Sequence, residues 1–137
     1  MQKYFGKLPG TPSNLIRLAL EDLEKVRKDS RYEIDMNQWH SPNIYNSRCS
    51  VCLGGNVIAK SLDTYSIYHA PHDFPKESLA LKALDNFRQG YLCEGLRDLG
   101  IYKNVPDADH IVEYSEDPEE FINQMHFIAD YFEYIGL

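Results

Sequence analysis

The sequence places one histidine and two cysteines close together. His40 precedes Cys49 and Cys52, which form a C-x-x-C pair. Thiolate and imidazole are the donors that tetrahedral zinc prefers, so these three residues could hold a metal together with a fourth ligand. The candidates for that ligand are His69, His72 and Cys93. Structural zinc sites usually combine two short knuckles of regular spacing, and only one is present, so the pattern argues against metal.

Cys49 could instead act as a nucleophile. It follows a polar loop and stands at the start of a predicted helix, where the macrodipole stabilises a thiolate and a nearby imidazole can take the proton. His40, His69 or His72 could be that base, and the sequence does not choose among them. A small cysteine- or metal-dependent hydrolase is therefore the alternative function. A redox role is disfavoured because no βαβ pattern surrounds the pair.

A structural role for the cysteines is the interpretation we favour. Cys52 shares the apolar face of the predicted helix with Gly55 and Ala59, and free cysteine is a common core residue. We therefore expect Cys52 to be a buried core thiol and Cys49 to lie at the helix start. We expect no metal and no other cofactor.

Charge is distributed unevenly along the chain, whose net charge is −7. Residues 1–31 hold seven basic and four acidic side chains, whereas residues 98–137 hold ten acidic side chains and one lysine. Such a tail repels nucleic acid and attracts basic surfaces. Tyrosines lie among these acids, and tyrosine is enriched in binding hot spots. The predicted binding residues are Tyr114, Glu116, Asp117, Glu119, Glu120, Tyr131 and Tyr134. A solvated face is the simpler account of the acidic run, because three of its acids stand at the start of the last predicted helix, where negative charge is favourable.

Length and composition indicate one globular domain over residues 1–137. At 137 residues the chain can bury a sizeable core, and its 43% hydrophobic content is ordinary for a soluble protein. No apolar run is long enough to span a membrane, and the N-terminus is too polar for a signal peptide. Three cysteines without an export signal indicate reduced thiols. These features predict a cytoplasmic protein that does not bind membranes.

Hydrophobic periodicity predicts a mainly α fold, a compact helical bundle with at most a small two-stranded sheet. Thr11-Pro12 and Asp117-Pro118 are helix-start signals, each followed by apolar residues at helical spacing. The resulting helices run from about residue 12 to 28 and from about 118 to 135. Further helices are predicted over residues 76–89 and 91–99. Alternation around Ile34 predicts a strand, which would pair with a second strand near Ile111 and Val112.

The segment from Cys49 to Leu62 is also predicted to be helical, because its apolar residues recur at helical spacing. Gly54 and Gly55 are costly inside a helix, at about 1 kcal/mol each relative to alanine. Close packing of another backbone at a helix crossing would justify that cost. A break in the helix would explain the two glycines too.

The segment from Met36 to Leu62, "MNQWHSPNIYNSRCSVCLGGNVIAKSL", resembles a segment of small uncharacterised proteins of bacteriophages and prophages. In these proteins a Trp-His pair precedes a short loop and a helix of the form C-x-V-C-L-x-G. The resemblance covers about a fifth of the chain and carries no known activity. It implies that Trp39, His40 and the cysteines form one structural unit. It also implies a context, since phage accessory proteins of this size often bind a host protein.

The function we expect is therefore non-catalytic. The protein would be a phage-type accessory factor in the host cytoplasm that binds a host protein through its acidic, tyrosine-rich surface. A nucleic-acid-binding host protein is a natural target, because its basic surface complements such a face. Self-association is left open. The competing class is the hydrolase built on Cys49 and His40 with the loop that contains His69 and His72.

Overall fold

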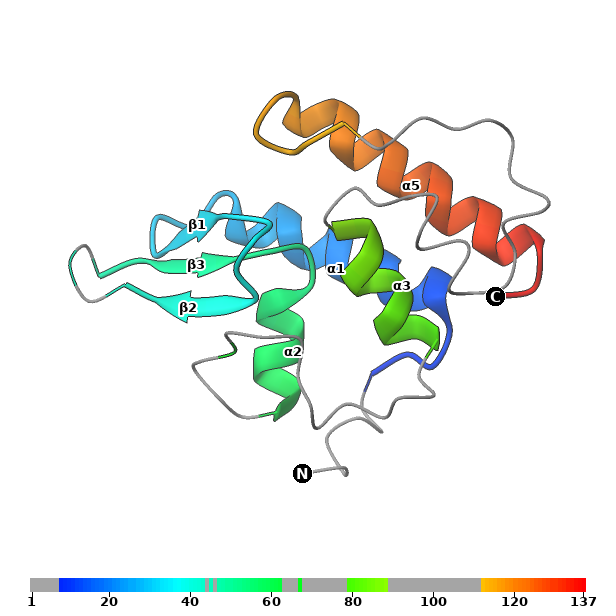
Figure 1. Cartoon of the computed structure of the whole chain (residues 1–137), viewed down its shortest axis with the longest axis horizontal. Coiled ribbons are helices and arrows are strands. Elements are labelled where there is room, and N and C mark those ends of the chain that lie inside the picture. Colours follow the sequence, from blue (N-terminus) through cyan, green and yellow to red (C-terminus); the bar gives the residue numbers. More distant parts are fainter. Residues whose placement is uncertain (1–7, 44, 46, 63–66, 68–78, 89–111) are drawn as a thin grey trace.

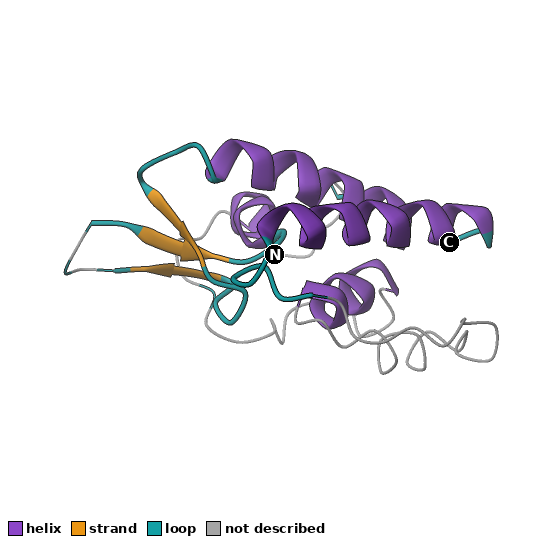
Figure 2. Cartoon of the chain, turned by 90° about the horizontal axis from the view of Figure 1, so that it is seen from above, coloured by secondary structure: helices purple, strands orange, loops and turns teal. Residues whose placement is uncertain are grey.

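The computed structural model describes residues 8–43, 45, 47–62, 67, 79–88 and 112–137. These residues form four helices packed together and a small three-stranded mixed sheet (Figure 1). The sheet lies at one end of the molecule, and the two longest helices run side by side away from it (Figure 2). The predicted mainly α fold is confirmed. None of the helices in the described part of the chain is both long and apolar enough to cross a membrane.

The two long helices begin where the capping signals predicted. Helix α1 spans Pro12–Val26, and the Thr11 side chain accepts a hydrogen bond from a backbone N–H of its first turn. Helix α5 spans Pro118–Tyr134, and the Asp117 carboxylate accepts from the N–H of Glu120 at 3.1 Å. A side-chain oxygen at this position satisfies a backbone donor that the helix itself cannot.

Helices α1 and α5 pack antiparallel to each other. The start of α1 meets the end of α5, where the Ser13 hydroxyl donates to the Leu137 carbonyl at 2.6 Å. Further along α1, Arg17 pairs with carboxylates near the end of α5, and Arg27 pairs with Glu119 near its start at 2.8 Å. Apolar side chains of both helices are buried between these polar contacts. The predicted stripes therefore form the core.

The sheet differs from the predicted one. Strands β1 (Tyr32–Ile34), β2 (His40–Pro42) and β3 (Cys49–Val51) lie in the order β1-β3-β2, with β1 parallel and β2 antiparallel to β3. The predicted strand around Ile34 is confirmed, but its partner is β3. Ile111 lies outside the described residues, and Val112 is not in a strand.

The predicted helix over residues 49–62 is wrong in its first part. Cys49 lies in strand β3, and helix α2 begins only at Gly55 and ends at Leu62. Gly54 between them has a φ of +83°, a left-handed conformation that favours glycine and breaks the helix. The positive φ of Ser47 (59°) similarly marks the turn before β3.

Gly55 packs against another backbone, although not at a helix crossing. A Cβ at this position would lie 2.8 Å from the carbonyl carbon of Trp39 and overlap its oxygen. Gly54 instead faces the side chain of Leu84 in helix α3 (Leu79–Arg88). The expectation of close backbone packing holds for Gly55, and the approaching segment is the residue before strand β2.

Helix α3 lies within the helix predicted over residues 76–89 and contributes Phe87 to the core, where its ring is 5.3 Å from that of Phe132. Its last residue, Arg88, is only 4% exposed. The guanidinium stacks on Trp39 at 4.2 Å and pairs with Asp85 at 3.0 Å. It also donates to the Met36 carbonyl. Arg88 thus ties α3 to the segment that enters β2. The predicted helix over residues 91–99 lies outside the described residues.

Candidate functional site

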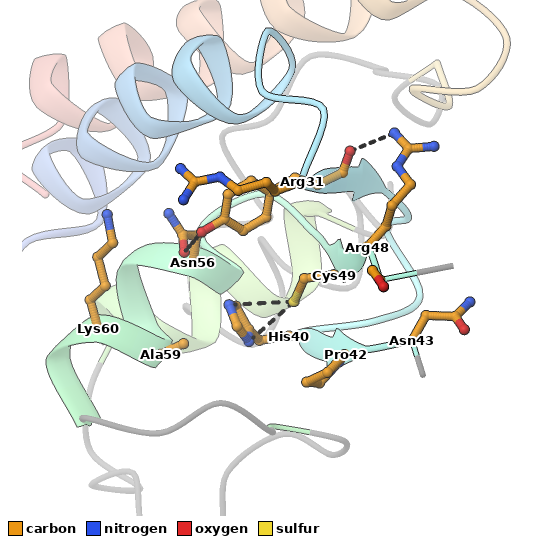
Figure 3. A pocket seen from close by; sticks show the side chains of 11 residues that line it. Arg31, His40, Pro42, Asn43, Arg48, Cys49, Asn56, Ala59 and Lys60 are labelled. Carbon is orange, nitrogen blue, oxygen red and sulfur yellow. Dashed lines mark hydrogen bonds between the residues drawn. The ribbon is translucent and has the colours of Figure 1, made fainter. Parts of the chain in front are cut away.

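Strand pairing brings His40 and Cys49 together. His40 of β2 is opposite Val51 of β3, and Cys49 lies two residues from Val51 on the same strand. Residues two apart in a strand point to the same face, so His40 and Cys49 are diagonal neighbours there. The Cys49 Sγ is 3.4 Å from Nδ1 and 3.6 Å from Nε2 of His40 (Figure 3). In the alternative hydrolase predicted from the sequence, Cys49 would be the nucleophile and His40 one of the candidate bases.

Backbone contacts hold His40 in place. Its N–H donates to the carbonyl of Ile67 at 3.2 Å, and the N–H of Ile67 donates back to the His40 carbonyl at 2.9 Å. The imidazole also meets the Tyr32 ring edge-on, with centroids 6.5 Å apart. The residue is buried. The imidazole is therefore held beside the thiol by several elements.

The electrostatic setting of Cys49 is not the one predicted. Because Cys49 lies in a strand, no helix N-terminus stabilises its thiolate. Burial raises the pKa of the Cys49 thiol, and this outweighs a backbone hydrogen bond at Ser41 that acts in the opposite direction. The group is therefore mainly a neutral thiol at neutral pH. The prediction that Cys49 lies at a helix start is wrong, and the alternative nucleophile loses the dipole activation that this position would have given it.

Cys52 is a buried core thiol, as predicted. It is 2% exposed, and burial raises its pKa to about 12. The thiol donates to the Leu53 carbonyl at 3.4 Å. Within the described residues no three or more His, Cys, Asp or Glu side chains are grouped to hold a metal. This contradicts the alternative zinc set of Cys49, Cys52 and His40. His69, His72 and Cys93 lie outside the described residues.

A pocket of about 530 Å³ opens beside the Cys49–His40 pair. It lies between the sheet and helix α2, with Cys49 and His40 near its centre and Lys60 and Arg48 on different sides (Figure 3). The lining residues are Arg31, Tyr32, His40, Pro42, Asn43, Ser47, Arg48, Cys49, Asn56, Ala59 and Lys60. Sequence reasoning missed the cations and Asn56, because their convergence depends on how α2 packs on the sheet.

Four of the seven predicted binding residues have structural roles. Asp117 caps α5, and Glu119 pairs with Arg27. Tyr114 packs edge-on against Phe121, with ring centroids 5.9 Å apart. Tyr131 is half-buried and packs against the core. These contacts account for the four side chains without any partner protein.

The other three predicted residues, Glu116, Glu120 and Tyr134, are exposed. Tyr134 is 87% exposed, and Phe127 on the same helix is 68% exposed. Sequence reasoning missed Phe127, although its place outside the buried stripe of the helix was a usable signal. It also missed Asp130 and Glu133. We define the outer α5 face as Glu120, Phe127, Asp130, Glu133 and Tyr134 of the helix, together with Glu116 in the turn before it.

No family model matches the chain, and no curated protein or solved structure proves similar to it. Function is therefore inferred from the geometry of these two regions.

Proposed function

We propose that the protein is a non-catalytic, phage-type accessory factor that binds a basic surface of a host protein through the outer α5 face. The observation that supports this most directly is that one helix exposes two aromatic side chains and several carboxylates. Phe127 and Tyr134 are seven residues apart, which places them on the same side of α5, about 10 Å apart along its axis. Large exposed aromatic side chains flanked by polar groups are typical of binding surfaces.

The carboxylates near the C-terminal end of α5 do not stabilise the helix dipole. The last turn of α5 carries no basic residue, although positive charge is favourable at a helix C-terminus and negative charge is not. Asp130 and Glu133 lie near this end, where only Arg17 of α1 pairs with them among the described residues. Near the other end, Glu116 and Glu120 form no ion pair within the described part of the chain. Asp130 and Glu133 share one guanidinium, so the described face keeps a net negative charge that a basic partner would complement.

A basic partner fits this face better than a second copy of the chain. In a symmetric dimer built on the outer α5 face, carboxylates of one copy would be brought near carboxylates of the other, and like charges oppose such contacts. A surface rich in Lys and Arg would be attracted instead, which speeds association and makes it sensitive to salt. A host protein that binds nucleic acid has such a surface. This partner class agrees with the excess of acids in the C-terminal third of the sequence.

The test has two steps. A host protein is captured first, and its affinity for matched variants of this protein is then measured. The tagged protein is incubated with a bacterial host lysate at low and high salt, and a captured protein is identified and purified for affinity measurement. Replacing Phe127 and Tyr134 by serine should weaken binding at least tenfold. Replacing Tyr45 by serine is the control, because Tyr45 is 93% exposed but lies in the loop between β2 and β3. Charge reversal at Glu116 and Glu120 should reduce binding most at low salt.

Two results would contradict the proposal. One is a partner whose affinity is unchanged by the Phe127 and Tyr134 substitutions. The other is binding that weakens equally when Tyr45 is replaced, since the outer α5 face would then have no special role.

The hydrolase alternative retains one supporting observation, the contact between Cys49 and His40. A nucleophilic thiol in such an enzyme is normally activated as the thiolate, whereas burial raises the pKa of Cys49. The discriminating measurement is alkylation by iodoacetamide at pH 7. We expect Cys49 to react more slowly than a free thiol, and a much faster reaction would favour the hydrolase.

A further inference from the structure

The pocket beside Cys49 has a charge opposite to that of the whole chain. Its described lining includes Arg31, Arg48 and Lys60 but no aspartate or glutamate, whereas the protein has a net charge of −7. A concave surface lined by one sign of charge concentrates counter-charged ligands. This concentration of cations therefore indicates what kind of molecule the pocket favours.

The three cations do not contribute equally. Arg31 is bound by Asp29, which accepts from its Nε at 3.0 Å and from a terminal nitrogen at 2.6 Å. This neighbouring carboxylate offsets its charge. Lys60 forms no ion pair within the described residues. The Arg48 guanidinium donates to the Tyr32 carbonyl at 2.6 Å, which holds it at the pocket. Lys60 and Arg48 line different sides of the pocket, so their positive charges flank its centre.

The polar groups between these cations are already ordered. The Tyr32 hydroxyl donates to Asn56 Oδ1 at 3.3 Å, and Asn56 Nδ2 donates to Asp22 at 3.1 Å. Asn56 is buried at the start of α2, so this chain of hydrogen bonds joins α1, the sheet and α2. A pocket whose wall is preorganised in this way loses little freedom when a ligand binds.

We propose that this pocket binds a small organic ligand bearing a carboxylate or phosphate group. Lys60 and Arg48 attract the anionic group, because ammonium and guanidinium are the side chains that bind oxyanions. The rest of the ligand lies against the Cys49 thiol and the His40 imidazole, which Figure 3 places between those two cations. This site is separate from the outer α5 face and is proposed independently of it.

Alkylation of Cys49 by a charged and a neutral reagent tests the proposal. With iodoacetate or iodoacetamide, the sulfur displaces iodide, an S–C bond replaces the C–I bond, and the thiol proton leaves to solvent. The two reagents differ mainly in charge, so the ratio of their rates reports the field at the sulfur. The modified residue is identified by peptide mass spectrometry, and the unfolded chain in urea supplies the reference ratio. We expect the folded protein to favour iodoacetate about tenfold more than the unfolded chain does.

Variants locate the source of the preference. Lys60→Gln and Arg48→Gln should each lower the ratio toward the reference value, and Lys60→Arg should preserve it. The double substitution Asp29→Asn with Arg31→Gln is the matched control, because it removes an ion pair without changing the net charge, and it should change the ratio least. Circular dichroism confirms that each variant is folded. A folded-state ratio equal to the reference, or one insensitive to both Lys60 and Arg48, would refute the proposal.

Protection experiments identify the anionic group. Inorganic phosphate and acetate are each added at constant ionic strength while Cys49 reacts with neutral iodoacetamide. Protection by phosphate alone assigns the site to a phosphate-bearing ligand, and protection by acetate alone assigns it to a carboxylate. Protection by both supports their shared chemistry. If neither slows the reaction, the pocket does not bind small oxyanions and the proposal fails.

Discussion

Replacing Gly55 by alanine should destabilise the protein more than any other single methyl addition at a glycine of the described chain. The new Cβ would lie 2.8 Å from the carbonyl carbon of Trp39 and overlap the carbonyl oxygen. Carbon atoms in ordinary contact are about 3.5–4.0 Å apart. Helix α2 and the segment before β2 must therefore separate by about 1 Å. That separation would also disturb His40, the residue after Trp39, and with it the contact to Cys49.

Two opposing effects determine how far Gly55→Ala lowers the free energy of unfolding. Alanine gains about 1 kcal/mol over glycine in a helix interior and less at a first turn, which is where Gly55 lies. Overpacking a well-packed site costs about 1–3 kcal/mol, and more when the obstacle cannot move. Here the obstacle is backbone rather than a flexible side chain. We therefore expect a net loss of about 3 kcal/mol or more in the free energy of unfolding.

Urea unfolding followed by circular dichroism measures this loss, and thermal unfolding should show a fall in Tm of about 10 °C. Gly10→Ala is the matched control, because a Cβ there meets nothing within 4 Å. Gly54→Ala should be intermediate, at about 1–3 kcal/mol, because its φ of +83° is strained for alanine but the Leu84 side chain in its way can rotate. If Gly55→Ala costs less than about 1 kcal/mol, the close approach of Trp39 is wrong.

Four further predictions concern single side chains. Arg88→Ala should lower the free energy of unfolding by about 2–4 kcal/mol in urea titrations, through loss of the stacking on Trp39 and of buried hydrogen bonds. Asp117→Ala should cost about 1 kcal/mol by removing the cap of α5, and Asp117→Ser should restore it. The rate of alkylation of Cys49 should rise with pH to a midpoint above that of the unfolded chain, because burial raises its pKa. Mass spectrometry over the same pH series should find Cys52 unmodified at neutral pH while the protein stays folded.

The long helices could be predicted from the sequence because their signals are local. Thr11 and Asp117 each stand one residue before a helix and accept a backbone hydrogen bond from its first turn. The apolar residues that follow recur every three or four positions, which places them on one face whatever the rest of the chain does. Burial of Cys52 was also predicted from a helix stripe and is confirmed, although Cys52 lies between β3 and α2 and not in a helix.

The sheet could not be predicted in this way. A strand of three residues has almost no periodicity of its own, and the residues from Val51 onward have the spacing of a helix. What excludes a helix there is the parallel pairing of Cys49–Val51 with Tyr32–Ile34, a contact between segments far apart in the sequence. The positive φ of Gly54 then delays the helix until Gly55.

For the candidate sites too, part was predictable from the sequence and part depended on tertiary structure. The sequence alone determined which residues can do chemistry, and it named Cys49 and His40 among them. Only tertiary structure decided that they meet, because antiparallel pairing of β2 with β3 sets them diagonally on one face. Tertiary packing also decided that burial, rather than a helix dipole, controls the pKa of the thiol. Charge and burial at one point depend on every segment that passes near it, and the linear order of residues does not contain that proximity.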